Sequence, residues 1–463
     1  MNSPRDALLK FLSDLGDFDH QTLVDYGIPS FLLSLLTKDA VIKDDLFSSK
    51  LLKNVFYAAS KNSHVRSEAE DALQILSKIV DESKCDEAII YSAKALGELF
   101  KDKQASIGMT SMISLTKKLA CCSNSGECKA SILFALANAS LLSEANKIFI
   151  SSKITTIDDV AAVLSPDTVP SCCSMIANSS YRCSTAAYNF LQSEFVPVLV
   201  SNGKHIIDNT FDENEENTLV LERMLEMLAN LSNSPQNQSL VESIEDVIPF
   251  VRKVLLVADG SSVVTKAARA CASICYFTNS ARRSFGLDCS ESLTDIILRR
   301  GLYNETNEDE AESMAAIEAC KALSSLLVDD FTKAQFLTNV QDVKSLVQLF
   351  LSTESKGVLS GGAMIVSILL PLSAEEQTAL LLEGRQSLIA NENGEAVLQR
   401  CANECYYDDI EIQPQWLTNA VALVQMKSTT VAASEVLCKV RLQERERTLE
   451  DFFSITDLFE TFS

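Results

Sequence analysis

Apolar residues recur at spacings of three and four along most of this chain, which is the pattern of helices that bury one face. Ile132, Leu133, Leu136 and Ala139 show it within one stretch. A helix of this kind cannot cover its apolar stripe alone, so it must stack against neighbouring helices. Glycine and proline are sparse, at 14 and 9 of 463 residues, which favours helices joined by short connections.

A six-residue motif repeats near the ends of these helical stretches. Its form is a small or apolar residue, an apolar residue, any residue, Asn or a small residue, an apolar residue and Ser, as in Ala135–Ser140 and Met227–Ser232. The fourth motif position falls at residues 58, 97, 138, 178, 230, 275, 325 and 367, at intervals of 39 to 52 residues. Helical repeats of the armadillo and HEAT type have periods of about 40–47 residues.

The repeat predicts an all-α fold, a right-handed α-solenoid of armadillo/HEAT-like repeats. About eight units are expected over residues 1–380, because eight motif positions fall there and a solenoid grows by adding units. The period is lost after about residue 380. Residues 381–463 are predicted to hold degenerate repeats that act as a cap, followed by an acidic amphipathic tail.

The segment Val24–Leu36 resembles the armadillo consensus, in which Gly-Ile-Pro opens the second helix of a unit. Here Gly27 would end a short helix and Pro29 would fit the first turn of the next one. The resemblance covers roughly residues 20–380 and is degenerate in places, so a HEAT-like or mixed solenoid is the alternative. It implies that the third helices line a concave groove where extended peptides or partner domains bind.

The resemblance also implies partner contacts for the asparagines at the fourth motif position, Asn138, Asn178 and Asn230. The alternative is that each Asn caps a helix end or is a satisfied interior polar group. The other motif copies replace Asn with Gly97, Cys275, Ser325 and Ser367. Nuclear-import receptors of the family pair each Asn with a Trp, and the one tryptophan here is Trp416, so binding of import signals is not expected.

The net charge is −23, from 40 Lys and Arg against 63 Asp and Glu. Such a chain repels nucleic acid and anionic lipid and attracts basic protein segments, although acidity also simply favours solubility. Two long repeat intervals contain acidic loops that enter helices. We expect Asp212, Glu213, Glu215 and Glu216 to meet a basic partner, and Glu310 and Glu312 to complement a helix dipole.

The sequence contains no motif for catalysis, a cofactor or a metal. Its three histidines, His20, His64 and His205, lie in no known catalytic or metal-binding signature. The 14 cysteines are irregularly spaced, and two clusters, Cys121/Cys122/Cys128 and Cys172/Cys173/Cys183, match no zinc pattern. They are predicted to be reduced core residues of a cytoplasmic, or alternatively nuclear, protein.

One apolar stretch, Gly357–Ala374, is barely long enough to span a membrane and contains Pro371. It is predicted to be a buried solenoid helix rather than a membrane span.

The leading hypothesis is a non-catalytic scaffold that binds a basic or extended protein segment along an acidic groove. Two alternatives remain open. The acidic array without the import-receptor tryptophans looks like the small-GTPase dissociation stimulators, which implies a chaperone or guanine-nucleotide exchange factor for small GTPases. An armadillo cofactor of a heat-shock chaperone is the other. No enzyme activity, cofactor, nucleic-acid partner or membrane insertion is expected.

Overall fold

The computed structural model describes Lys10, Phe31 and residues 51–54, 70–101, 109–120, 125–157, 159–208, 214–302, 310–369, 396–398 and 400–401. Every regular element in these ranges is a helix and none is a strand, which confirms the all-α prediction. The chain divides into two compact units, Met1–Val247 and Ile248–Ser463, and we describe each by itself. The predicted boundary near residue 380 lies outside the described residues.

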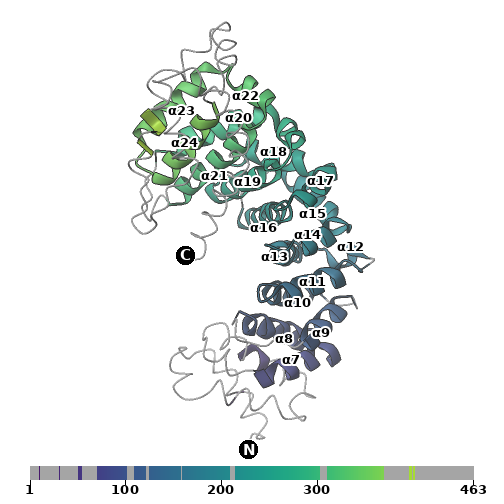
Figure 1. Cartoon of the computed structure of the whole chain (residues 1–463). Helices are drawn as coiled ribbons and strands as arrows, with labels where there is room; N and C mark the ends of the chain where they lie inside the picture. The colour runs from purple at the N-terminus through teal and green to yellow at the C-terminus, as the bar shows by residue number, and fades with distance from the viewer. Residues whose placement is uncertain are drawn as a thin grey trace, which may run out of the picture. The chain divides into compact units, whose positions relative to one another are not determined.

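Unit 1 is built from short helices that repeat in groups of three (Figure 1). The complete groups are α11 to α13 and α14 to α16, so α13 and α16 are the third helices of their groups. Helices α8 and α10 are the third helices of the two preceding groups. The helices are α7 (Glu70–Glu82), α8 (Asp86–Leu99), α9 (Met109–Ala120), α10 (Gly126–Ser140), α11 (Glu144–Ile154), α12 (Val160–Val163), α13 (Val169–Ser180), α14 (Ser184–Leu191), α15 (Phe195–Asp208), α16 (Glu215–Leu231) and α17 (Pro235–Ser243).

The core of unit 1 lies between its third helices, α8, α10, α13 and α16, each of which packs on the next. Small and apolar side chains such as Ala135, Leu136 and Met175 are fully buried there. Small residues let neighbouring backbones approach closely. Gly97 shows how closely, because a Cβ at that position would lie 2.6 Å from the Phe134 ring of α10.

Side-chain caps fix where many of the helices begin. Ser125, Ser143, Asn214 and Ser234 each precede a helix and accept a hydrogen bond from the backbone N–H three residues ahead. Each cap satisfies one of the backbone donors that the first turn of a helix leaves unpaired. The first residues of these four helices are therefore specified by the local sequence.

Unit 2 follows the same three-helix plan. Its third helices, α19, α21 and α24, pack in succession. The 14 residues of α24 give a length of about 21 Å at ~1.5 Å per residue, which is short of the ~30 Å hydrocarbon core of a bilayer. Its helices are α18 (Val247–Val257), α19 (Ser261–Cys275), α20 (Asn279–Arg300), α21 (Glu310–Leu327), α22 (Asp330–Phe336), α23 (Val340–Ser352) and α24 (Lys356–Leu369).

The apolar stretch that begins at Gly357 forms most of α24, and most of its side chains are buried. The prediction of a buried solenoid helix is therefore confirmed for the part of the stretch that the structure describes. Across the described ranges, no helix combines the length and the apolar character that crossing a membrane requires.

Helix α20 is two helices joined at Gly286. This glycine has φ of 68° and ψ of −167°, a conformation that residues with a Cβ rarely adopt. The break separates the first helix of the repeat from the second. Gly286 thus has the role that the armadillo resemblance gave to Gly27, which lies outside the described residues.

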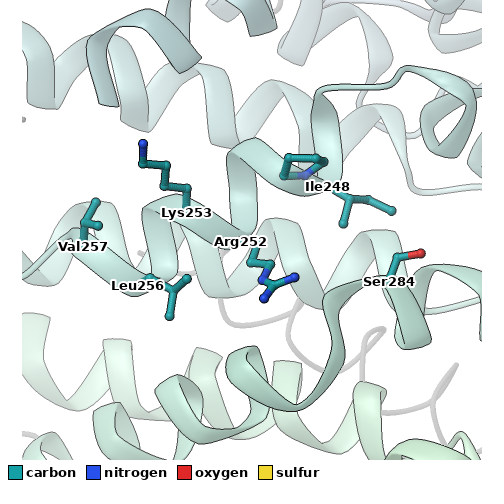
Figure 2. A pocket seen from close by; sticks show the side chains of 7 residues that line it. Ile248, Arg252, Lys253, Leu256, Val257 and Ser284 are labelled. Carbon is teal, nitrogen blue, oxygen red and sulfur yellow. The ribbon is translucent and has the colours of Figure 1, made fainter. Parts of the chain in front are cut away.

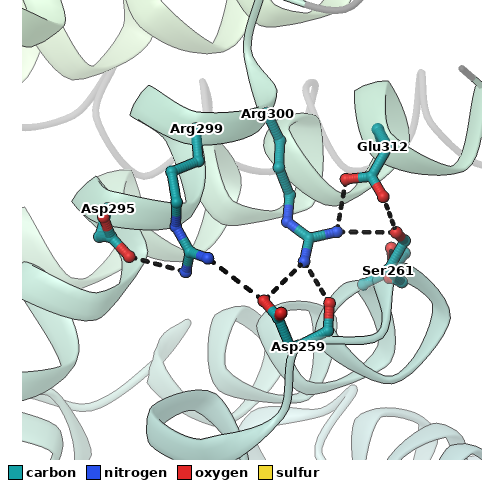
Figure 3. A network of polar contacts seen from close by, with 7 residues as sticks. Asp259, Ser261, Asp295, Arg299, Arg300 and Glu312 are labelled. Atoms are coloured by element: carbon teal, nitrogen blue, oxygen red, sulfur yellow. Dashed lines mark hydrogen bonds and ion pairs between the residues drawn. The ribbon is translucent and has the colours of Figure 1, made fainter.

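A network centred on Arg300 joins three helices of unit 2 (Figure 3). The guanidinium of this buried residue at the end of α20 donates to Ser261 Oγ at 2.7 Å and to Glu312 Oε2 at 2.5 Å, and also to the carbonyl of Asp259. Arg299 bridges Asp259 and Asp295 at the edge of the network. A buried guanidinium needs such acceptors, so the network fixes how α19, α20 and α21 meet.

Asp329 forms a further ion pair in this unit, outside the Arg300 network, and caps α22. Its carboxylate accepts from Arg283 Nε at 3.1 Å and from the Thr332 backbone N–H at 3.0 Å. Burial of Asp329 opposes ionisation, but the hydrogen bonds from Arg283 and Thr332 outweigh it and lower the pKa of the carboxyl below its ordinary value. The ionised form therefore stabilises the folded unit.

Gly286→Ala is expected to destabilise unit 2 by about 1–3 kcal/mol, because a Cβ strains the backbone at positive φ even where space is open. Chemical denaturation followed by circular dichroism measures the loss. Ser284→Ala, two residues earlier on an exposed helix position, is the matched control and should shift stability by less than about 0.5 kcal/mol. Equal stability of the Gly286→Ala and native chains would contradict the strain argument.

Asp329→Asn keeps the cap but removes the charge, so it is expected to lower stability by about 1.5–3 kcal/mol at neutral pH. Because the native pKa is depressed, the stabilisation is present above the unfolded value of about 3.9 and is lost as pH falls through the folded pKa. The difference in melting temperature between the two chains should therefore shrink in acid. A difference that stays constant down to low pH would be inconsistent with the ion pair, and Asp330→Asn, at an exposed carboxylate, is the control.

Candidate protein-binding surface

The third helices of unit 1 share one partly exposed line of side chains, which we call the third-helix face. Along α16 the line passes through Glu215, Leu219, Glu222, Glu226 and Asn230, whose spacings of three and four place them on one side of the helix. The other helices contribute Glu87, Tyr91 and Lys94 from α8, Glu127, Phe134 and Asn138 from α10, and Ser171, Ser174 and Asn178 from α13.

The three predicted asparagines link consecutive third helices. The amide Nδ2 of Asn138 donates to the carbonyl of Gly97 at 3.0 Å, Asn178 donates to Ala137 at 3.2 Å, and Asn230 donates to Ala177 at 3.1 Å. Each bond reaches a carbonyl in the last turn of the preceding helix. Two of these carbonyls accept a second hydrogen bond, Ala137 from Ser140 Oγ at 2.7 Å and Ala177 from the Tyr181 backbone N–H at 3.0 Å. One N–H of each amide therefore has a structural role, as the alternative interpretation held.

Each of these asparagines is also half-buried rather than enclosed. An amide has a second N–H and an acceptor oxygen in addition to the donor used here. The groups that point outward remain suitable for a partner backbone, so a structural role and a binding role are compatible for Asn138, Asn178 and Asn230.

The hydrogen bonds also correct the register of the motif copy at Lys94–Leu99. The acceptor Ala137 directly precedes Asn138, and the acceptor Ala177 directly precedes Asn178. In α8, the preceding third helix, the acceptor is Gly97. The residue after it, Glu98, therefore corresponds to Asn138 and Asn178, and Gly97 does not. The motif spacing placed Gly97 there and was wrong by one residue.

Glu98 is only 4% exposed. Its Oε1 pairs with Lys101 Nζ at 2.7 Å, and its Oε2 has no hydrogen-bond partner among the described residues. Lys101 Nζ also lies 5.6 Å from the centre of the Phe134 ring, within the range of a cation–π contact. Lys101, which is half exposed, therefore connects this end of the face to α10.

The α16 part of the third-helix face is acidic and carries one exposed apolar side chain. Leu219 is 42% exposed, between Glu215 and Glu216 on one side and Glu222 and Glu226 on the other. Arg223 neutralises Glu226 in part through a 3.1 Å ion pair. Of the four predicted acidic residues, Glu215 and Glu216 are exposed in the first turn of α16, whereas Asp212 and Glu213 lie outside the described residues.

The corresponding face of unit 2 begins with cations instead. On α19 the partly exposed line passes through Ser262, Lys266 and Arg269, and Cys275 is fully buried. On α21, Glu310 is exposed in the first turn, as the dipole interpretation expects, but Glu312 accepts hydrogen bonds from Arg300 and Ser261. Glu312 thus belongs to the packing of the unit.

The described cysteines are free thiols, and all except Cys85 are buried. Burial raises the pKa of Cys172 to about 12 and raises that of Cys271 well above its ordinary value. Buried protonated thiols are poor nucleophiles and metal ligands. In the described part of the chain, no three His, Cys, Asp or Glu side chains gather closely enough to hold a metal ion, and His205 lies exposed on α15.

Solved structures share this fold. The beta-catenin armadillo solenoid, from a study of a phosphorylation switch that controls the interaction between cadherin and beta-catenin, superposes with a TM-score of 0.63 at 14% identity, over 91% of this chain and 80% of that one. A crystal structure of Uso1-1 gives 0.53 at 12% identity, over 90% and 78%. No protein-family model and no curated protein matches the sequence. The similarity confirms an armadillo-like α-solenoid.

Asn178→Ala is expected to destabilise unit 1 by about 1 kcal/mol, because it removes the hydrogen bond that links α13 to the Ala137 carbonyl of α10. Hydrogen exchange should show faster opening at the adjoining ends of α10 and α13. Ser174→Ala lies one turn earlier on the same face, and its hydroxyl bonds within its own helix to Pro170, so it should change exchange little. Identical exchange in the two variants would rule out the linking role.

Proposed function

We propose that this chain is a non-catalytic scaffold whose third-helix face in unit 1 binds a basic or extended segment of a partner protein. The observation that carries the proposal is the α16 part of that face, where Leu219 lies exposed among Glu215, Glu216 and Glu222. An apolar anchor surrounded by charge is the usual arrangement of an interface, in which the apolar contact gives affinity and the charges give specificity.

The structural role of the asparagines supports this assignment. Hydrogen bonds between successive third helices hold the face in one arrangement before a partner binds. Binding therefore carries little entropy cost for ordering the face. We propose that Asn138, Asn178 and Asn230 contribute their remaining amide groups to an extended segment. Asp212 and Glu213, which directly precede α16 in sequence, would extend the acidic surface.

The expected partner is a protein with a basic segment rather than nucleic acid or a lipid surface, because the face itself is acidic. The small-GTPase and heat-shock-chaperone alternatives remain predictions, since no described contact distinguishes those partners from another basic protein. Free buried cysteines fit a reducing compartment, the cytoplasm or nucleus.

The test uses a fluorescein-labelled peptide that carries one leucine flanked by lysines, added to the full chain and followed by anisotropy. Glu215→Gln, Glu216→Gln and Glu222→Gln together should weaken binding about tenfold, as three exposed ion pairs of ~0.5 kcal/mol each would give. Added salt should reduce the difference.

The control removes the same charge from exposed positions of unit 1 outside the face, with Glu144→Gln, Glu194→Gln and Glu245→Gln. Equal weakening by the two triple variants would show that net charge alone attracts the peptide, and the proposal would then fail. Purification of the tagged chain followed by mass spectrometry should recover a natural partner that the face variant loses and the control variant keeps.

A further inference from the structure

Unit 2 has a groove between α18 and α20 that the proposed function does not use. Its volume is about 460 Å³, within the ~300–1,000 Å³ range of ligand sites. Figure 2 shows that Ile248, Arg252 and Leu256 follow one another along α18, and that Ser284 lines the groove from α20. The spacing of four places the α18 residues on one side of the helix.

The chemistry of the groove is apolar at its ends and cationic in the middle. Leu256 and Val257 are 49% and 46% exposed, which leaves apolar surface in contact with water. Between them and Ile248 lie Arg252 and Lys253. Arg252 forms an exposed ion pair with Asp288 through one terminal nitrogen of its guanidinium. A guanidinium has five N–H donors, so within the described part of the chain others remain for a second carboxylate.

This combination fits a segment that is both apolar and acidic. The chain carries one at residues 450–460, Glu-Asp-Phe-Phe-Ser-Ile-Thr-Asp-Leu-Phe-Glu, with five large apolar residues, four carboxylates and no Lys or Arg. Phe452, Ile455 and Phe459 have the i, i+3, i+7 spacing of one helix face. The groove offers cations to the carboxylates and exposed apolar surface to the aromatic rings.

The segment can reach the groove from the last described residue of unit 2. Residues 402–449, which separate Cys401 from the segment, would span up to about 150 Å when extended. A segment tethered in this way reaches an effective concentration on the order of millimolar. A shallow groove can therefore hold it even when its intrinsic affinity is weak.

We propose that residues 450–460 of this chain dock in the groove between α18 and α20 and cover Leu256 and Val257. The contact is intramolecular and pairs Arg252 and Lys253 with carboxylates of the segment. The chain would then occupy its own groove, and an acidic amphipathic segment of another protein could bind there only by displacing residues 450–460. The inference is independent of the basic partner proposed for unit 1.

The test is photocrosslinking within the full chain, with Leu256 replaced by benzoylphenylalanine. After irradiation and digestion, mass spectrometry should find the groove crosslinked to peptides from residues 450–460. The yield should not change over an about twentyfold range of protein concentration, because an intramolecular contact does not depend on it. The same probe at Leu302, which is 62% exposed and does not line the groove, should give no such product.

Two variants test the proposed contacts separately. Arg252→Glu with Lys253→Glu should lower the crosslink yield about fivefold, since two ion pairs become repulsive. Phe452→Ser with Phe459→Ser should lower it as strongly while leaving α18 and α20 unaltered. Crosslinks to another segment, crosslinks to a second copy, or none at all would overturn the proposal.

Discussion

The packing of each third helix on the next is the interaction on which the rest of the structure depends. A short amphipathic helix is not stable alone, so each unit obtains its stability from its neighbours. In unit 1 the apolar contacts are supplemented at each step by an amide hydrogen bond, from Asn138, Asn178 and Asn230 to the preceding helix. Close packing requires small side chains, and at Gly97 the approach to α10 leaves no room for a Cβ.

Much of this arrangement was accessible from the sequence. Periodic apolar residues and the Asn-containing motif were enough for the all-α solenoid and for the third helices, because both follow from local patterns that repeat. The register at Glu98 was missed because Gly97 satisfies the small-residue position of the motif, whereas the shifted segment Ala95–Phe100 places a glutamate there. Only the hydrogen bond from Asn138 to Gly97 distinguishes the two registers.

The break at Gly286 and the Arg300 network could not be read from the sequence for a different reason. No proline follows Gly286 to mark the start of a helix, and the helical pattern continues on both sides. Arg300 draws its acceptors from residues up to 41 positions away. Such contacts depend on the packing of one helix against another, and the residue pattern of a single helix does not predict that packing. The predicted acidic residues illustrate the same limit, because Glu312 turned out to serve packing.

Glu98 shows why the row of linking amides cannot simply continue towards the N-terminus. An asparagine can donate to the preceding helix while it accepts elsewhere, but an ionised carboxylate can only accept. At this position the chain uses an ion pair to Lys101 instead, and Lys101 in turn contacts Phe134. Two kinds of contact therefore link this end of α8 to α10. One is the cation–π contact of Lys101 with Phe134, and the other is the amide hydrogen bond from Asn138 to Gly97. The asparagine link from α10 still reaches α8 through Gly97, but the position next to it holds a buried carboxylate, Glu98, instead of an amide.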